Sequence, residues 1–140
     1  ALRPVDLERH GFIETIRKYA DDFGPQNGLR VEVEMADVGS LDLHNEAVLF
    51  RIFQEAMHNV AKHANARTVK VRLGRDARDQ VFVEVEDDGS GFDPTAVTDR
   101  VSSAGGLGLR QMHERMHARG GALAITSTPG VGTKLRATLP

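Results

Sequence analysis

The feature that most constrains the fold is a long segment with one continuous apolar face. Between residues 44 and 64, apolar side chains recur at the three- and four-residue intervals of an α-helix. They stand at positions 49, 52, 53, 56, 57, 60, 61 and 64. A helix with so broad an apolar face has to pack on a second apolar layer, because tertiary packing supplies most of the stability of such a helix.

The rest of the chain supplies that layer as strands. Several segments alternate apolar and polar residues, which is typical of a strand with one buried face. Strands are predicted at 29–35 (LRVEVEM), 68–74 (TVKVRLG), 81–87 (VFVEVED), 122–130 (ALAITSTPG) and 132–140 (GTKLRATLP). Polar turn residues separate most of these segments, so a mostly antiparallel sheet is expected.

Two further helices are predicted from their capping residues. One covers residues 7–23, with Asp6 as its N-cap and the turn residues 24–28 at its end. The other opens at the glycine-rich AGGLGL segment and continues to about Ala118. The expected fold is therefore α/β: one domain over residues 1–140, with a mixed, mostly antiparallel sheet and about three helices on one face.

Composition excludes several classes of function. The chain of 140 residues has no cysteine, which removes disulfides and thiolate metal sites and fits a reducing compartment. It has no apolar run of about 18 residues, so we expect no direct membrane contact. A net charge of −2, with Tyr19 as the only Tyr or Trp, argues against nucleic-acid binding.

A possible zinc motif stands near the C-terminus. HERMH, at residues 113–117, matches the H-E-x-x-H pattern of zinc metalloproteases. A zinc site needs a third protein ligand, yet no Asp, Glu or His follows His117, and Leu123 occupies the place of the third histidine of the extended motif. We therefore interpret the segment as a helix that buries Met112 and Met116 and exposes its histidines.

A polar stripe on the long helix is the first candidate for chemistry. Arg51, Glu55, Asn59 and Lys62 follow one another at intervals of four, four and three residues, which places them on one side of a helix. The stripe is either a solvated surface or a ligand site. Asn has no propensity reason to stand within a helix, and its amide oxygen can bind Mg²⁺ while the lysine contacts phosphates.

Two glycine-rich segments are the other candidates. In DDGSG (87–91), a carboxylate that ends a strand can accept a hydrogen bond from the amine of adenine, although the segment also suits a simple turn. GGLGL (105–109) opens a helix, whose N-terminus is a ready phosphate site. It is neither a Walker A loop nor a Rossmann fingerprint. The glycines before Thr133 alone indicate only a hairpin turn.

In this order and spacing the motifs resemble the Bergerat-fold ATPase superfamily. Within it, the chain resembles the catalytic ATP-binding domain of sensor histidine kinases, in the subgroup paired with helix-turn-helix response regulators. The resemblance is carried by LRPVDLERHGF (2–12), FRIFQEAMHNVAKHANA (50–66), VEDDGSGFD (85–93), GGLGLRQMHERM (105–116) and GGALAITSTPGVGTKLRATLP (120–140). It implies a two-layer Bergerat-type sandwich that uses ATP and Mg²⁺.

The resemblance also implies roles for residues of the long helix. Asn59 corresponds to the Mg²⁺-binding asparagine of the N box. Glu55 corresponds to the acidic residue that helps to activate the acceptor histidine. Lys62 and His63 stand where phosphate-contacting residues are expected.

Further roles are implied for the glycine boxes. Asp87 would read adenine, Gly89 and Gly91 would shape its pocket, and Thr133 would lie near the base. The second glycine box would flank the phosphates, and a short ATP lid would cover them. The box consists of Gly106, Leu107 and Gly108, and the lid consists of residues 93–104.

The resemblance also implies protein partners that carry the parts of the family's reaction not found in this sequence. In this family the acceptor histidine lies on a dimerisation hairpin, which this chain lacks; His10, in the lead-in segment, is not assigned as the acceptor. The chain is therefore expected to be the cytoplasmic catalytic domain of a longer kinase that signals to a response regulator. The alternative is a stand-alone serine kinase of the anti-sigma-factor type, and a degenerate nucleotide-binding module is a third possibility.

Overall fold

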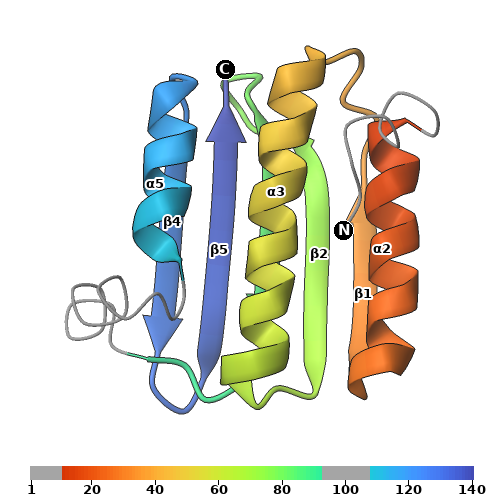
Figure 1. Cartoon of the computed structure of the whole chain (residues 1–140), viewed down its shortest axis with the longest axis vertical. Coiled ribbons are helices and arrows are strands. Elements are labelled where there is room, and N and C mark those ends of the chain that lie inside the picture. Colours follow the sequence, from red (N-terminus) through yellow and green to blue (C-terminus); the bar gives the residue numbers. More distant parts are fainter. Residues whose placement is uncertain (1–10, 93–107) are drawn as a thin grey trace.

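The computed structural model describes residues 11–92 and 108–140, and its centre is a five-stranded sheet (Figure 1). The strands are β1 (Arg30–Met35), β2 (Thr68–Arg75), β3 (Val81–Asp87), β4 (Ala122–Thr128) and β5 (Gly132–Leu139). Their order across the sheet is β1-β2-β3-β5-β4. Only the β1–β2 pair is parallel, and the other three pairs are antiparallel. The sheet is thus mixed and mostly antiparallel, as predicted.

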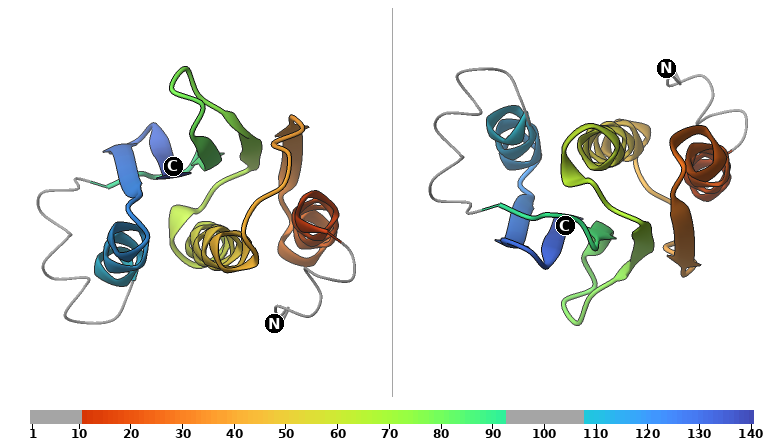
Figure 2. Two further views of the ribbon diagram at one scale, coloured as in Figure 1. Left: turned by 90° about the horizontal axis from the view of Figure 1, so that it is seen from above. Right: turned by 90° about the horizontal axis from the view of Figure 1, so that it is seen from below.

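Within the described ranges, three α-helices pack on one face of this sheet. They are α2 (Phe12–Asn27), α3 (Leu43–Asn59) and α5 (Leu109–Ala118), and a π-helical turn, η1 (Val60–Ala64), continues α3. Figure 2 shows all three helices on the same side of the sheet, with the opposite side uncovered in the described part of the chain. The predicted two-layer α/β sandwich is confirmed.

The core lies between the two layers. Helix α3 contributes Leu49, Ile52, Phe53 and Met57, each with no exposed surface. The inward side chains of β2, β3 and β5 meet them from the sheet. Complete burial of one such side chain contributes about 1.5–3 kcal/mol, so this interface supplies much of the stability of the domain.

Helix α2 differs from the predicted helix at both ends of its described part, and the predicted N-cap Asp6 and residues 7–10 lie outside the described residues. It begins at Phe12, because Gly11 has a φ of 79°, which lies outside the helical region. It continues through Gly24 and Pro25 to Asn27, and Gly28 caps it in a left-handed conformation. Gly24 has no Cβ to clash with the ring of Pro25, so the helix tolerates the proline. A Cβ on Gly24 would also stand only 2.9 Å from the Leu29 carbonyl oxygen. Gly24 therefore permits close packing where a helix stop was predicted.

The predicted apolar face of the long helix is interrupted at one position. Asp42 caps the helix through its side chain, which accepts a hydrogen bond from the backbone N–H of His44 at 2.7 Å. Residues up to Val60 are buried as predicted, whereas Ala61 is exposed. This difference falls within the π-helical turn, whose wider i→i+5 turns shift the register of the side chains. Ala64, at the end of the turn, is again partly buried against the core.

No helix in the described ranges 11–92 and 108–140 has the length and apolar character needed to cross a membrane.

Candidate functional site

The site is built around a buried carboxylate at the end of β3. Asp87 points to the helix side of the sheet, like Val83 and Val85 before it, and is 8% exposed. Its Oδ1 atom accepts a hydrogen bond from the backbone N–H of Gly89 at 2.8 Å. Burial raises the pKa of Asp87, although backbone hydrogen bonds from Gly89 and Thr133 oppose this effect. The geometry holds a carboxylate in place for a hydrogen-bond donor.

The glycine turn after Asp87 is locked between two other segments. A Cβ on Gly89 would lie 2.1 Å from the Ala64 carbonyl oxygen, and the N–H of Ser90 donates to that oxygen at 2.6 Å. A Cβ on Gly91 would lie 2.1 Å from the Thr128 carbonyl oxygen. We predicted that these glycines allow close approach to a ligand. The close approaches that the structure shows are to the protein backbone.

The β4–β5 hairpin completes the wall of the site. Thr133 is the cross-strand partner of Asp87 in the β3–β5 pair. Gly132 has a φ of 141°, and a Cβ there would lie 2.1 Å from the Asp87 carbonyl oxygen. The sequence analysis interpreted this glycine as part of an ordinary hairpin, and Gly132 is therefore a missed site residue. Its signal was its position next to Thr133.

Ser127 was also missed. Its hydroxyl lies 2.8 Å from the Thr133 hydroxyl and accepts a hydrogen bond from the N–H of Phe92, also at 2.8 Å. The available signal was the alternation of β4, in which Leu123, Ile125 and Ser127 share the inward face. A serine on an otherwise apolar inward face needs polar partners.

The polar stripe of the long helix divides at the π-helical turn. Glu55 and Asn59 are half-buried on α3, and Asn59 is its last residue. The Oδ1 atom of Asn59 is itself inaccessible to solvent. Lys62 and His63 follow within η1, where both side chains are exposed. Helices of this type are frequent at functional sites, and here the turn separates a sheltered amide from two exposed basic groups.

The start of α5 approaches this stripe. Gly108 precedes the helix with a φ of 66°, and a Cβ on it would stand 3.7 Å from the Oε2 atom of Glu55. The structure thus brings the Glu55 carboxylate next to Gly108, the residue that precedes α5. Gly106 and Leu107 lie outside the described residues, as does the predicted lid at 93–104.

The histidines of the zinc motif point away from the core. His113 and His117 are exposed on α5, while Met112 and Met116 are 1% and 0% exposed, as the helix-surface interpretation predicts. Within residues 11–92 and 108–140, no group of three or more His, Asp or Glu side chains is placed to hold a metal ion.

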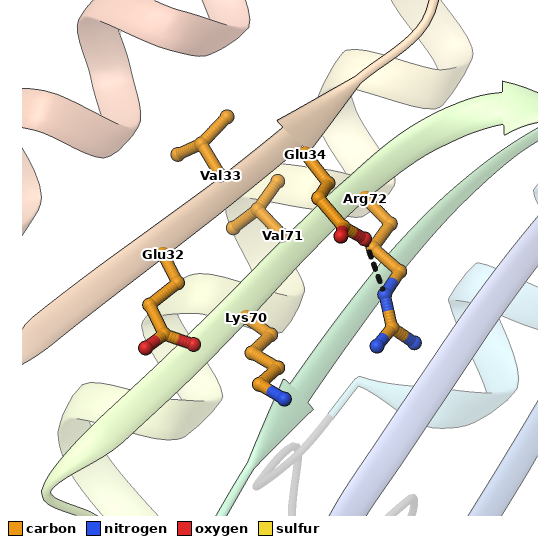
Figure 3. A pocket seen from close by; sticks show the side chains of 6 residues that line it. All are labelled: Glu32, Val33, Glu34, Lys70, Val71 and Arg72. Atoms are coloured by element: carbon orange, nitrogen blue, oxygen red, sulfur yellow. Dashed lines mark hydrogen bonds and ion pairs between the residues drawn. The ribbon is translucent and has the colours of Figure 1, made fainter.

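The outer face of the sheet carries different side chains. Glu32, Lys70, Glu86 and Lys134 form one row of cross-strand neighbours on it. A cavity of about 620 Å³ lies over this row and is also lined by Asp87, Gly132 and Thr133 at the strand ends. A smaller hollow of about 140 Å³ lies beside it. Figure 3 shows the side chains that line the smaller one, with a hydrogen bond between Glu34 and Arg72. Neither cavity is lined by Glu55 or Asn59, so both are separate from the stripe on the helix side.

The family assignment comes from comparison with known proteins. Residues 44–140 match the family described as histidine kinase-, DNA gyrase B- and HSP90-like ATPases. The chain belongs to this family. The matched range contains every site residue discussed above, and the ATPase family is the one that the ordered glycine boxes predicted.

Curated relatives of this ATPase domain are sensor kinases. An uncharacterised sensor-like histidine kinase of Chloroflexus aurantiacus is 36% identical over 99% of this chain and 24% of its own length. The sensor histidine kinase LiaS of Bacillus subtilis is 34% identical over 99% of this chain and 37% of its own length. The chain thus spans only 24% and 37% of the lengths of these two relatives.

Solved structures share the fold. The histidine kinase domain of the blue-light-activated kinase of Erythrobacter litoralis has a TM-score of 0.73 at 22% identity, over 89% of this chain and 58% of that one. Full-length ShkA in complex with AMPPNP has a TM-score of 0.71 at 21% identity, over 94% of this chain and 29% of that one. At these identities the likeness establishes the Bergerat-type fold.

Proposed function

We propose that this domain binds Mg²⁺–ATP and donates the γ-phosphoryl group to a histidine on a separate dimerisation hairpin of the same protein. The observation that carries the proposal is the buried Asp87 carboxylate, held by backbone N–H groups at the edge of a glycine turn. The sensor-kinase relatives and the AMPPNP complex of ShkA support it.

Asp87 is proposed to select the base. A carboxylate is only an acceptor, so it pairs with the exocyclic amine of adenine. Thr133 lies directly across β3–β5 from it, and the interlocked Gly89 and Gly91 keep the turn beside it close to the neighbouring backbone. The base would therefore contact groups fixed by the sheet.

The phosphate end is proposed to lie between α3 and α5. Mg²⁺ takes oxygen ligands, often one or two from the protein with the rest from phosphates and waters, and the sheltered amide oxygen of Asn59 fits that pattern. When bound, Mg²⁺ would neutralise charge on the phosphates. Lys62 and His63 are proposed to contact the phosphates, together with the second glycine box at Gly106, Leu107 and Gly108.

Glu55 is proposed to act on the acceptor. Its half-buried carboxylate lies next to Gly108 at the start of α5, one helical turn before Asn59. A carboxylate in this place can polarise an imidazole that enters the site, which makes that imidazole a better nucleophile. The hairpin then supplies the histidine, a response regulator receives the phosphoryl group, and the domain works in the cytoplasm, where ATP is available.

The binding part is tested by titrating the chain with ATP and GTP, with and without Mg²⁺. We expect ATP to bind more tightly than GTP. Asp87→Asn should weaken ATP binding roughly ten- to a hundredfold, because a hydrogen bond to a charged group contributes about 1.5–3 kcal/mol. Equal affinity of the unmodified chain for the two nucleotides would contradict the proposal.

The transfer part is tested with labelled ATP and the hairpin of the parent protein. We expect acid-labile, base-stable phosphate on the hairpin and little on the 140-residue chain alone. Glu55→Ala should slow phosphoryl transfer while ATP affinity stays nearly unchanged. Asn59→Ala should reduce the Mg²⁺ dependence of both the transfer rate and the ATP affinity. Stable phosphoserine on another protein would instead favour the anti-sigma-factor type of kinase.

A further inference from the structure

The hydroxyl of Ser127 has three polar neighbours. It accepts a hydrogen bond from the N–H of Phe92 at 2.8 Å, and it donates to the carbonyl oxygen of Gly132 at 3.2 Å. It also lies 2.8 Å from the Thr133 hydroxyl, and either oxygen of that pair could be the donor. Both hydroxyl residues are half-buried.

The chemistry of the three contacts fixes the direction of the third. A hydroxyl has one proton to donate and two lone pairs that accept. The Gly132 carbonyl only accepts, so it uses the Ser127 proton, and the Phe92 N–H uses one lone pair. All three contacts are hydrogen bonds only if Thr133 donates to Ser127. The Thr133 oxygen then has no proton left and is only an acceptor for any ligand.

Thr133 is placed to contact whatever Asp87 contacts. The two residues are direct cross-strand partners, and the Asp87 carboxylate accepts a hydrogen bond from the Thr133 N–H. Side chains in such pairs have Cβ atoms about 4.5–5.5 Å apart on the same face of the sheet. A base bound at Asp87 therefore meets two neighbouring acceptors.

The Asp87 carboxylate by itself does not fully discriminate adenine from hypoxanthine and guanine. The amine of adenine donates to it, but so does the N1–H group of hypoxanthine or guanine after a small shift of the ring. The neighbouring group decides between them, because adenine offers the second proton of its amine and the other purines offer the oxygen at position 6. An acceptor beside Asp87 pairs with the former and repels the latter.

We propose that Ser127 is a positioning residue for base selection. It holds the Thr133 hydroxyl as an acceptor and so excludes purines with a carbonyl oxygen at position 6. This inference rests on the proposed binding of ATP and deepens it, because it assigns adenine selectivity to a pair of hydroxyl groups in addition to Asp87.

The test compares ATP with inosine triphosphate, which carries oxygen in place of the amine. Dissociation constants are measured by isothermal titration for the parent chain, Ser127→Ala and Ser127→Thr. In Ser127→Ala the Thr133 hydroxyl is free to rotate and to donate to the oxygen at position 6 of inosine triphosphate. The ratio of the two dissociation constants should therefore fall about tenfold, because one hydrogen bond contributes about that factor. Ser127→Thr retains a hydroxyl and should retain the preference.

The outcomes separate this inference from the proposed function. If Ser127→Ala lowers the affinity for ATP and for inosine triphosphate by the same factor, or changes neither affinity, Ser127 only stabilises the hairpin and the inference fails. If the parent binds neither nucleotide, the proposed function fails as well. Thermal melting checks that each variant is folded. Ser127→Cys replaces Ser127→Ala if that variant does not fold, and loss of folding in both would also overturn the inference.

Discussion

Strand β3 carries two buried carboxylates on opposite faces of the sheet, and their surroundings differ in kind. Glu84 is 2% exposed on the outer face, and Asp87 is 8% exposed on the inner face. Glu84 accepts hydrogen bonds from two arginines, Arg72 at 2.7 Å and Arg136 at 3.0 Å. For Asp87, the polar contacts in the described part of the chain are backbone N–H groups, without an ion pair.

The pKa values of the two groups move in opposite directions. Burial raises the pKa of Glu84, but the hydrogen bonds from Arg72 and Arg136 outweigh burial and leave it below its usual value. At Asp87 burial is the stronger effect, and its pKa is raised. The charge of Glu84 thus stabilises the fold, whereas the charge of Asp87 costs stability. Such costs are frequent at functional sites, which agrees with the proposed role of Asp87 in binding adenine.

The largest effect is expected from removing the outer carboxylate. Glu84→Ala leaves Arg72 and Arg136 close together without their acceptor. Breaking a buried ion pair costs about 3–5 kcal/mol, and because both arginines are about one-third exposed to water we expect about 2–3 kcal/mol. Urea denaturation measures this loss.

The matched control for this prediction is Glu84→Gln, which keeps the shape and removes the charge. Because the folded-state pKa of Glu84 is lowered, its contribution is present at neutral pH and disappears as pH falls through that pKa. The difference in stability between the parent and Glu84→Gln should therefore shrink in acid. A difference that does not depend on pH would mean that packing, and not charge, is responsible.

A smaller effect of opposite sign is expected at the inner carboxylate. In Asp87→Asn the cost of burying a charge is removed, so without nucleotide the unfolding free energy at pH 7 should be unchanged or higher. Because the folded-state pKa of Asp87 is raised, the parent itself recovers this cost as pH falls through that pKa. Urea denaturation at neutral pH and at about pH 5 measures the difference between the two proteins.

The same variant should lose most of the stabilisation that ATP provides to the parent, because that stabilisation follows the dissociation constant. Thermal melting with and without ATP gives this second result. An Asp87→Asn protein that is clearly less stable than the parent without nucleotide would show that the carboxylate serves the fold, and the contrast with Glu84 would fail.

The smallest effect is expected from the exposed charges next to Glu84. Glu86 lies 3.8 Å from Arg72 and 3.9 Å from Lys134, and its side chain is 36% exposed. Ion pairs of this kind contribute about 0–1 kcal/mol, so Glu86→Ala should change the unfolding free energy by less than about 0.5 kcal/mol. A loss as large as that of Glu84→Ala would mean that the outer face acts as one charge network.

Much of the architecture could be predicted from local patterns. The apolar face of α3 and the alternation of the strands identified the two layers, because a side chain's face depends on helical or strand period alone. The same reading singled out Asp87, Glu55 and Asn59, because the strand end and the helix stripe are local features. Whether they bind nucleotide remains a prediction.

Tertiary structure decided what depends on residues far apart in the sequence. Ser127 gains its role from Phe92, which lies 35 residues away in the sequence. Glu84 is buried on the outer face because β2 and β5 place an arginine on each side of it. No local pattern contains these pairings, because strand order and register arise only when the whole sheet assembles.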